Sequence, residues 1–176
     1  YVAEGLNNLA MVSYAKGEYD EAERLHREAL AILRKSLGEE HREVALSLGN
    51  VLHVLLTRED YPAAEAIGRE VLRRGRSHGT LAIVAVCLLK QAKYAEAEPI
   101  LRECLAIREK ELPDDWSRYN AMSMLGEALC GQGKHAEAEP LLVEGYEEMA
   151  PPEQLALRKG EALERVVRLY ESWKKP

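Results

Sequence analysis

The stretch that comes nearest to a cofactor motif is GQGKHA, from Gly131 to Ala136. Its glycines have the spacing that opens a dinucleotide-binding fingerprint, in which backbone amides approach a pyrophosphate. That fingerprint follows a strand within a βαβ unit, whereas the residues before Gly131 repeat their apolar side chains with helical spacing. We therefore interpret the stretch as a turn between two helices and predict no cofactor.

Cysteine and histidine do not form a recognisable metal or nucleophile motif. Cys87, Cys104 and Cys130 and the five histidines lack the close pairs that hold zinc, and EEHREVA, from Glu39, lacks the second histidine of a zinc-binding helix. We predict no metal site and no catalytic residue, so this segment is not an enzyme, although its parent protein can be one. Three thiols in apolar helical surroundings are typical of a reducing compartment, and we expect a cytoplasmic location.

Composition indicates a helical protein and disfavours two classes of partner. The 176 residues are 47% hydrophobic and 31% charged, and they include no Phe. A net charge of −6 opposes binding to nucleic acid. The longest apolar run, LAIVAVCLL from Leu81, is too short to cross a bilayer, so we predict no membrane partner. Because the sequence starts with Tyr1 inside a helical pattern, we expect an excerpt of a longer protein.

One phrase occurs four times. The copies are YDEAERLHREAL from Tyr19, YPAAEAIGREVL from Tyr61, YAEAEPILRECL from Tyr94 and HAEAEPLLVEGY from His135. We call the first residue of each copy its anchor. Alanine always stands three places after the anchor, at Ala22, Ala64, Ala97 and Ala138. This constancy predicts that two helices cross closely there, where a larger side chain would overpack at about 1–3 kcal/mol.

A second amphipathic segment precedes every anchor. Its apolar residues recur at intervals of three and four, as at Leu48, Val51 and Leu55, which is the spacing of one helix face. Glycines such as Gly17 lie between the two segments and suit the left-handed end of a helix. Asp115 can cap the helix that follows it. Each unit is thus predicted to be a helix, a tight turn and a second helix.

The units have approximate bounds of 2–37, 42–75, 79–111 and 115–150, and a further helix covers 153–174. That last helix either caps the array or begins a truncated repeat. Pro99 and Pro140 lie five residues after their anchors, so we predict that these second helices begin no earlier than Ala95 and Ala136.

These units resemble the tetratricopeptide repeat, a helix-turn-helix of about 34 residues. The first unit, with its paired Asn and its KSLGEEH connection, resembles the longer variety found in kinesin light chain. The later text GKHAEAEPLLVEGYEEM and ALERVVRLYESW resembles arrays at the ends of bacterial signalling proteins, Ser/Thr kinases among them. The resemblance implies one all-α domain over 1–176, a right-handed superhelical solenoid of antiparallel helix pairs.

The resemblance also implies that partners lie along a concave face made by the first helices. Residues rotated off the packing stripe are the candidates, with Asn7, Asn50 and His53 foremost, because an amide can donate to and accept from a peptide backbone. Met11, Leu56 and Val86 could equally belong to the core. The full set is Asn7, Met11, Tyr14, Leu46, Asn50, His53, Leu56, Ala82, Val86, Lys90, Asn120, Ser123 and Glu127.

The leading functional hypothesis is a non-catalytic scaffold that binds a peptide or helix of a partner protein. A first alternative is a regulatory or substrate-recruiting arm of a larger bacterial signalling enzyme, such as a Ser/Thr kinase. A second alternative is a self-association module, because an uncovered first unit would offer Leu6 and Leu9 to water and so permit a homo-oligomer.

Overall fold

A computed structural model describes residues 1–150, 153 and 156–173, and the elements of this part are nine α-helices. The chain divides into two compact units, and the described residues up to 76 belong to the first and those from 77 to the second. The predicted all-helical fold, with helices packed in sequential pairs, is confirmed. The outer residues of the predicted last helix, 154–155 and 174, lie outside the described residues.

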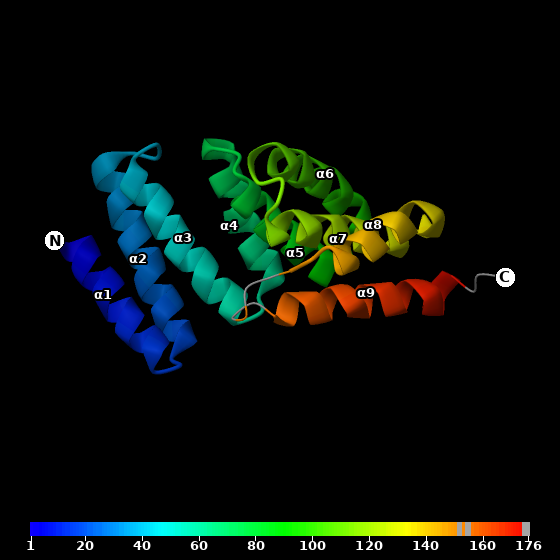
Figure 1. Cartoon of the computed structure of the whole chain (residues 1–176). Coiled ribbons are helices and arrows are strands. Elements are labelled where there is room, and N and C mark those ends of the chain that lie inside the picture. The colour runs from blue at the N-terminus through cyan, green and yellow to red at the C-terminus, as the bar shows by residue number, and fades with distance from the viewer. Residues whose placement is uncertain (151–152, 154–155, 174–176) are drawn as a thin grey trace. The chain divides into compact units, whose positions relative to one another are not determined.

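Unit 1 contains four helices, each packed against the next along the chain (Figure 1). They are α1 (Val2–Ala15), α2 (Tyr19–Leu37), α3 (Arg42–Thr57) and α4 (Tyr61–Arg74). The core lies between them and includes Leu25, Leu48 and Leu55. Here α1 and α3 are first helices of their pairs, and α2 and α4 are second helices.

Unit 2 contains five helices, of which α7 packs against both α8 and α9. They are α5 (His78–Lys90), α6 (Tyr94–Glu111), α7 (Trp116–Gly131), α8 (His135–Glu147) and α9 (Leu157–Trp173). The helices α7 and α8 approach closely, because a Cβ placed on Gly126 would lie 2.5 Å from Cγ of Leu142. The four alanines three places after the anchors, in α2, α4, α6 and α8, are all fully buried.

The turn inside each of the first four pairs contains a residue with positive φ, two places before the anchor. Gly17 and Gly133 adopt φ values of 81° and 77°, where glycine has no steric penalty. Glu59 and Ala92 occupy the same place with φ of 56°. Packing of the two helices therefore imposes the left-handed conformation even where the residue disfavours it.

Side-chain caps and prolines mark the helix starts. Asp115 accepts a hydrogen bond of 2.8 Å from the amide of Ser117, so its predicted capping role is confirmed. The prediction for Pro99 and Pro140 is wrong by one residue, because α6 and α8 begin at the anchors Tyr94 and His135. The backbone amide of a residue at the first helical position has no acceptor within the helix, so a start at the anchor requires no further hydrogen bond. The helix tolerates the loss of the one backbone hydrogen bond that proline cannot donate.

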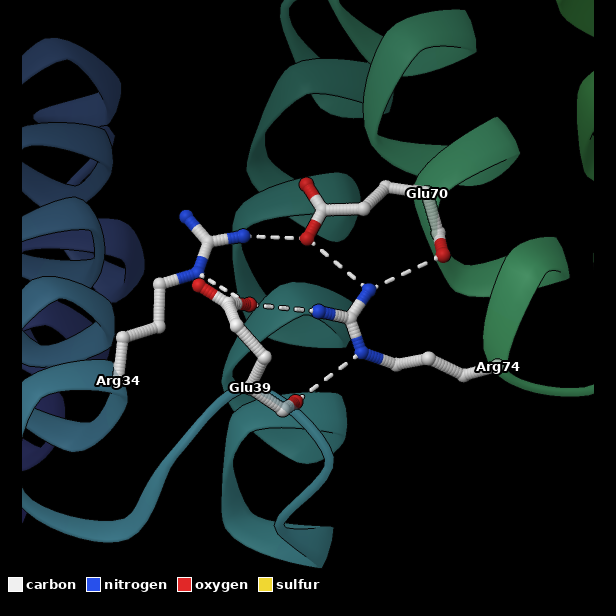
Figure 2. Close-up of polar contacts among 4 residues, drawn as sticks. All are labelled: Arg34, Glu39, Glu70 and Arg74. Carbon is white, nitrogen blue, oxygen red and sulfur yellow. Dashed lines mark hydrogen bonds and ion pairs between the residues drawn. The ribbon is translucent and has the colours of Figure 1, made fainter.

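Four charged side chains join α2, the segment after it and α4 (Figure 2). Arg34 pairs with Glu70 and lies 3.2 Å from Glu39, while Arg74 lies 2.8 Å from Glu39 and 3.0 Å from Glu70. Partial burial alone would raise the pKa of Glu70, but hydrogen bonds from Arg34 and the charge of Arg74 lower it overall. The network therefore keeps Glu70 ionised and ties two second helices together in unit 1.

Candidate functional site

In unit 1 the first helices α1 and α3 border a groove of about 740 Å³. Its walls come from α1, α2 and α3, together with the residues that directly precede α1 and α3. The lining residues are Tyr1, Ala3, Glu4, Asn7, Asn8, Leu33, His41, Arg42, Glu43, Leu46, Ser47 and Asn50. The structure thus brings three of the predicted binding residues, Asn7, Leu46 and Asn50, to one groove.

The groove presents both hydrogen-bonding groups and apolar surface. Asn8 and Asn50 are exposed, so their amides are accessible to a ligand. Leu46 is 57% exposed, so its side chain offers apolar surface at the groove. Ser47 is buried, and its Oγ has no hydrogen-bond partner among the described residues. A buried polar atom without a partner carries a free-energy cost, and the burial of this hydroxyl keeps it out of reach of a ligand in this arrangement.

Asn7 is held in place from the second helix of its own pair. His26 of α2 is buried, and its Nδ1 lies 2.8 Å from Oδ1 of Asn7. An amide oxygen only accepts, so Nδ1 carries the donated hydrogen. Burial lowers the pKa of His26, and the nearby His53 adds to this effect, so the ring is neutral at pH 7. The NH2 group of Asn7 thereby keeps a fixed orientation at the groove.

The other predicted residues of unit 1 lie near the far ends of α1 and α3. The ring of Tyr14 lies 5.0 Å from the ring of His53, and its hydroxyl is 2.8 Å from Oγ1 of Thr57. Met11 is exposed, and Leu56 is half-buried. These residues are not part of the groove lining, and Tyr14 contacts His53 and Thr57 of α3.

Unit 2 has a smaller groove of about 310 Å³ along its own first helices. Four predicted residues line it, namely Val86, Lys90, Asn120 and Glu127. Asn120 is mostly buried, and its Oδ1 has no hydrogen-bond partner among the described residues. Ala82 is half-buried and lies outside this groove.

The helix α9 engages the predicted residues of α7. Arg165 lies 2.6 Å from the carboxylate of Glu127, and its Nη1 donates to Oγ of Ser123 at 3.4 Å. Arg168 approaches Glu127 at 3.7 Å. Ser123 is fully buried, so a partner does not reach it in this arrangement. The sequence analysis missed Arg165 and Arg168, and the one available signal was their three-residue spacing on the last amphipathic helix.

The motif GQGKHA forms the end of α7 and the turn to α8, as predicted. The Sγ atom of Cys130 lies 3.6 Å from Nδ1 of His135, whereas Cys87 and Cys104 are buried. Within the described residues, no group of three or more His, Cys, Asp or Glu is arranged to hold a metal ion. The described helices also include none with the length and apolar character needed to cross a membrane.

The sequence profile of the tetratricopeptide repeat matches residues 1–77 and 79–147. The chain belongs to the tetratricopeptide repeat family. The two matched segments together span most of the sequence and cover the helix pairs α1 to α8. No curated protein matches the sequence of this tetratricopeptide repeat chain.

Solved structures support the same repeat fold. One similar structure is described as the nearly identical TPR-like repeats of a putative kinesin light chain from Podosopora anserina. Its sequence is 21% identical to that of this chain, with a TM-score of 0.72 over 96% of this chain and 84% of that one. MamA from Desulfovibrio magneticus RS-1 is 19% identical, with a TM-score of 0.65 over 96% and 93%. YrrB, described as a TPR protein with an unusual peptide-binding site, is 16% identical, with a TM-score of 0.58 over 94% and 84%.

Proposed function

We propose that this chain is a non-catalytic scaffold that binds an extended peptide of a partner protein in the groove between α1 and α3. The observation that carries the proposal is the combination of exposed Asn50, exposed Leu46 and the oriented amide of Asn7 in one groove. Amides suit a peptide backbone, because each side chain can donate and accept at once. The peptide-binding site named for YrrB, which shares the fold, supports the same class of ligand.

The ligand favoured by this groove is neither strongly acidic nor strongly basic. Its charged lining residues, Glu4, Glu43 and Arg42, include both signs. A clamp for a terminal carboxylate or a phosphate would need a cluster of cations. A peptide with one apolar side chain for Leu46 and a free backbone beside Asn50 fits the surface better.

A selection from a random peptide library against the purified chain tests the proposal. We expect enriched peptides to bind the wild type and to lose at least tenfold in affinity for an Asn50→Ala, Leu46→Ala variant. The substituted side chains are exposed, so the variant keeps its fold, which circular dichroism checks. Leu37→Ala is the matched control, because Leu37 is also exposed but lies outside the groove. Enriched peptides that bind the variant as tightly as the wild type would refute this site.

The alternative of a regulatory arm in a bacterial signalling enzyme rests on the sequence resemblance of the later units. The coding sequence upstream of Tyr1 tests it, because the hypothesis requires an enzyme domain in the same reading frame. That alternative is compatible with peptide binding in the groove, since a recruiting arm would use the same surface.

A further inference from the structure

The fourth repeat places a thiol beside an imidazole at the turn between its two helices. The Sγ atom of Cys130, near the end of α7, lies 3.6 Å from Nδ1 of His135, the first residue of α8. It also lies 3.6 Å from Oγ of Ser172 in α9. In the tautomer that carries its hydrogen on Nε2, His135 accepts the thiol hydrogen at Nδ1. A cysteine within hydrogen-bond reach of a histidine has the arrangement of a nucleophile and its base.

The other repeats indicate that the fold does not need this pair. Its two positions are the anchor and the residue five places before the anchor. In the first repeat they hold Tyr19 and Tyr14, whose ring centroids lie 5.2 Å apart. In the second and third repeats a tyrosine anchor follows a leucine, which is Leu56 or Leu89. Aromatic and aliphatic side chains therefore suffice to pack this turn, and the fourth repeat has reactive groups that packing does not require.

Cys130 is also open to a small reagent. It is half-buried, and it lines a pocket of about 420 Å³ between the ends of α7 and α9. Arg165, Arg168, Glu127 and Glu171 line the same pocket and supply two charges of each sign. The pocket therefore suits a small reagent without a strong net charge.

The end of α9 holds the imidazole in place. The rings of His135 and Trp173 are stacked, with centroids 5.9 Å apart and planes inclined by 27°. The hydroxyl of Ser172, the preceding residue, donates to the carbonyl oxygen of Leu169 at 2.9 Å and lies within reach of Sγ. One turn of α9 thus orients the base and brings a hydroxyl close enough to donate to a thiolate.

We propose that Cys130 is a site of thiol–disulfide exchange with small disulfides, in which His135 acts as the base. Nδ1 of His135 takes the thiol proton, and the Sγ thiolate attacks one sulfur of the reagent. The S–S bond of the reagent breaks as a new bond forms to Sγ. The other half leaves as a thiolate and takes up the proton from His135. Cys130 is thereby oxidised to a mixed disulfide, and half of the reagent is reduced to a thiol.

Dithiodipyridine, a small uncharged disulfide, tests the proposal on the full chain. The thiopyridone that it releases gives the rate by absorbance, and mass spectrometry identifies the modified cysteine. At pH 7 we expect Cys130 to react about fivefold faster than N-acetylcysteine, and Cys87 and Cys104 to react more slowly because they are buried. Cys130→Leu, which introduces the residue of the second and third repeats, should remove the fast phase.

Two variants of His135 test the base. His135→Tyr restores the anchor of the other repeats, and His135→Gln introduces a smaller side chain that is not a base. In both, the rate at pH 7 should fall about tenfold. This deficit should disappear above a pH of about 9, where a thiol ionises without a base. Circular dichroism should match the wild type, because tyrosine packs at the same place in the other repeats.

Three results would overturn the proposal. A rate for Cys130 no greater than that of N-acetylcysteine would make it an ordinary thiol. Equal rates in the wild type and in both His135 variants would deny the imidazole its role. A deficit of the same size at every pH would assign the effect of the variants to altered access to Sγ and not to the loss of a base.

Discussion

Replacing Gly145 with alanine tests the close approach of α7 and α8. The added Cβ would lie 2.9 Å from the backbone nitrogen of Ser123 and 3.0 Å from the carbonyl oxygen of Tyr119. Both are backbone atoms, so no side-chain rotation relieves the contact and the helices must separate. Overpacking of this kind costs about 1–3 kcal/mol. Alanine returns at most about 1 kcal/mol of helix propensity. With the full propensity gain subtracted, the expected net loss in the free energy of unfolding is about 0–2 kcal/mol, with a central value of about 1 kcal/mol.

Gly160→Ala in α9 is the matched control, because a Cβ there meets no atom within 4 Å. Only the propensity gain applies, so stability should rise by about 0.5–1 kcal/mol. Urea denaturation followed by tryptophan fluorescence measures both changes, since Trp116 and Trp173 both belong to unit 2. The two midpoints should move in opposite directions at unchanged slope. A Gly145→Ala variant at least as stable as the wild type would refute the close packing described here.

Three further outcomes follow from local contacts. Hydrogen bonds from its neighbours, Lys134 first, lower the pKa of Glu98 to about 2 from 4.5. Glu98→Gln should therefore lower the free energy of unfolding by about 0.5–1 kcal/mol at pH 7. Urea titrations at a series of pH values should show this loss in full above pH 4.5, and the difference from the wild type should disappear as the pH falls through 2. A difference that does not change with pH would contradict the pairing. Ala92→Gly should stabilise the fold by about 0.5–1 kcal/mol and so raise the midpoint of thermal unfolding, because a φ of 56° strains alanine. A lower midpoint would argue against that turn. Iodoacetamide should label Cys130 of the native chain before Cys104, as mass spectrometry can measure. Burial both raises the pKa of Cys104 and shields its thiol from the reagent. Early labelling of Cys104 would count against its burial.

The helix pairs could be predicted because the relevant signals are local. Apolar intervals of three and four residues define each helix face, and an invariant alanine marks each crossing whatever its neighbours are. The conformation of the turns was harder to predict from the sequence, because Glu59 and Ala92 adopt the positive φ that glycine favours. Tertiary packing imposes that backbone conformation, and the residue type at these two positions does not predict it.

The candidate site was only partly accessible to sequence reasoning. Asn7, Leu46 and Asn50 fall on one groove because offsets within α1 and α3 determine which way they point. Ser123 also has a suitable offset, yet it is buried and bonded to Arg165. That contact depends on the register between helices far apart in the sequence, which a single helical pattern does not specify.

The contact between Arg165 and Glu127 also affects which partners unit 2 can accept. Arg165 lies on the same polypeptide and already pairs with the Glu127 carboxylate at 2.6 Å. A ligand that binds the Glu127 carboxylate must displace Arg165, whereas a ligand that contacts only Val86 and Lys90 need not do so. The helix α9 therefore already pairs the charge of Glu127, and a cationic ligand would have to compete with Arg165 for that carboxylate.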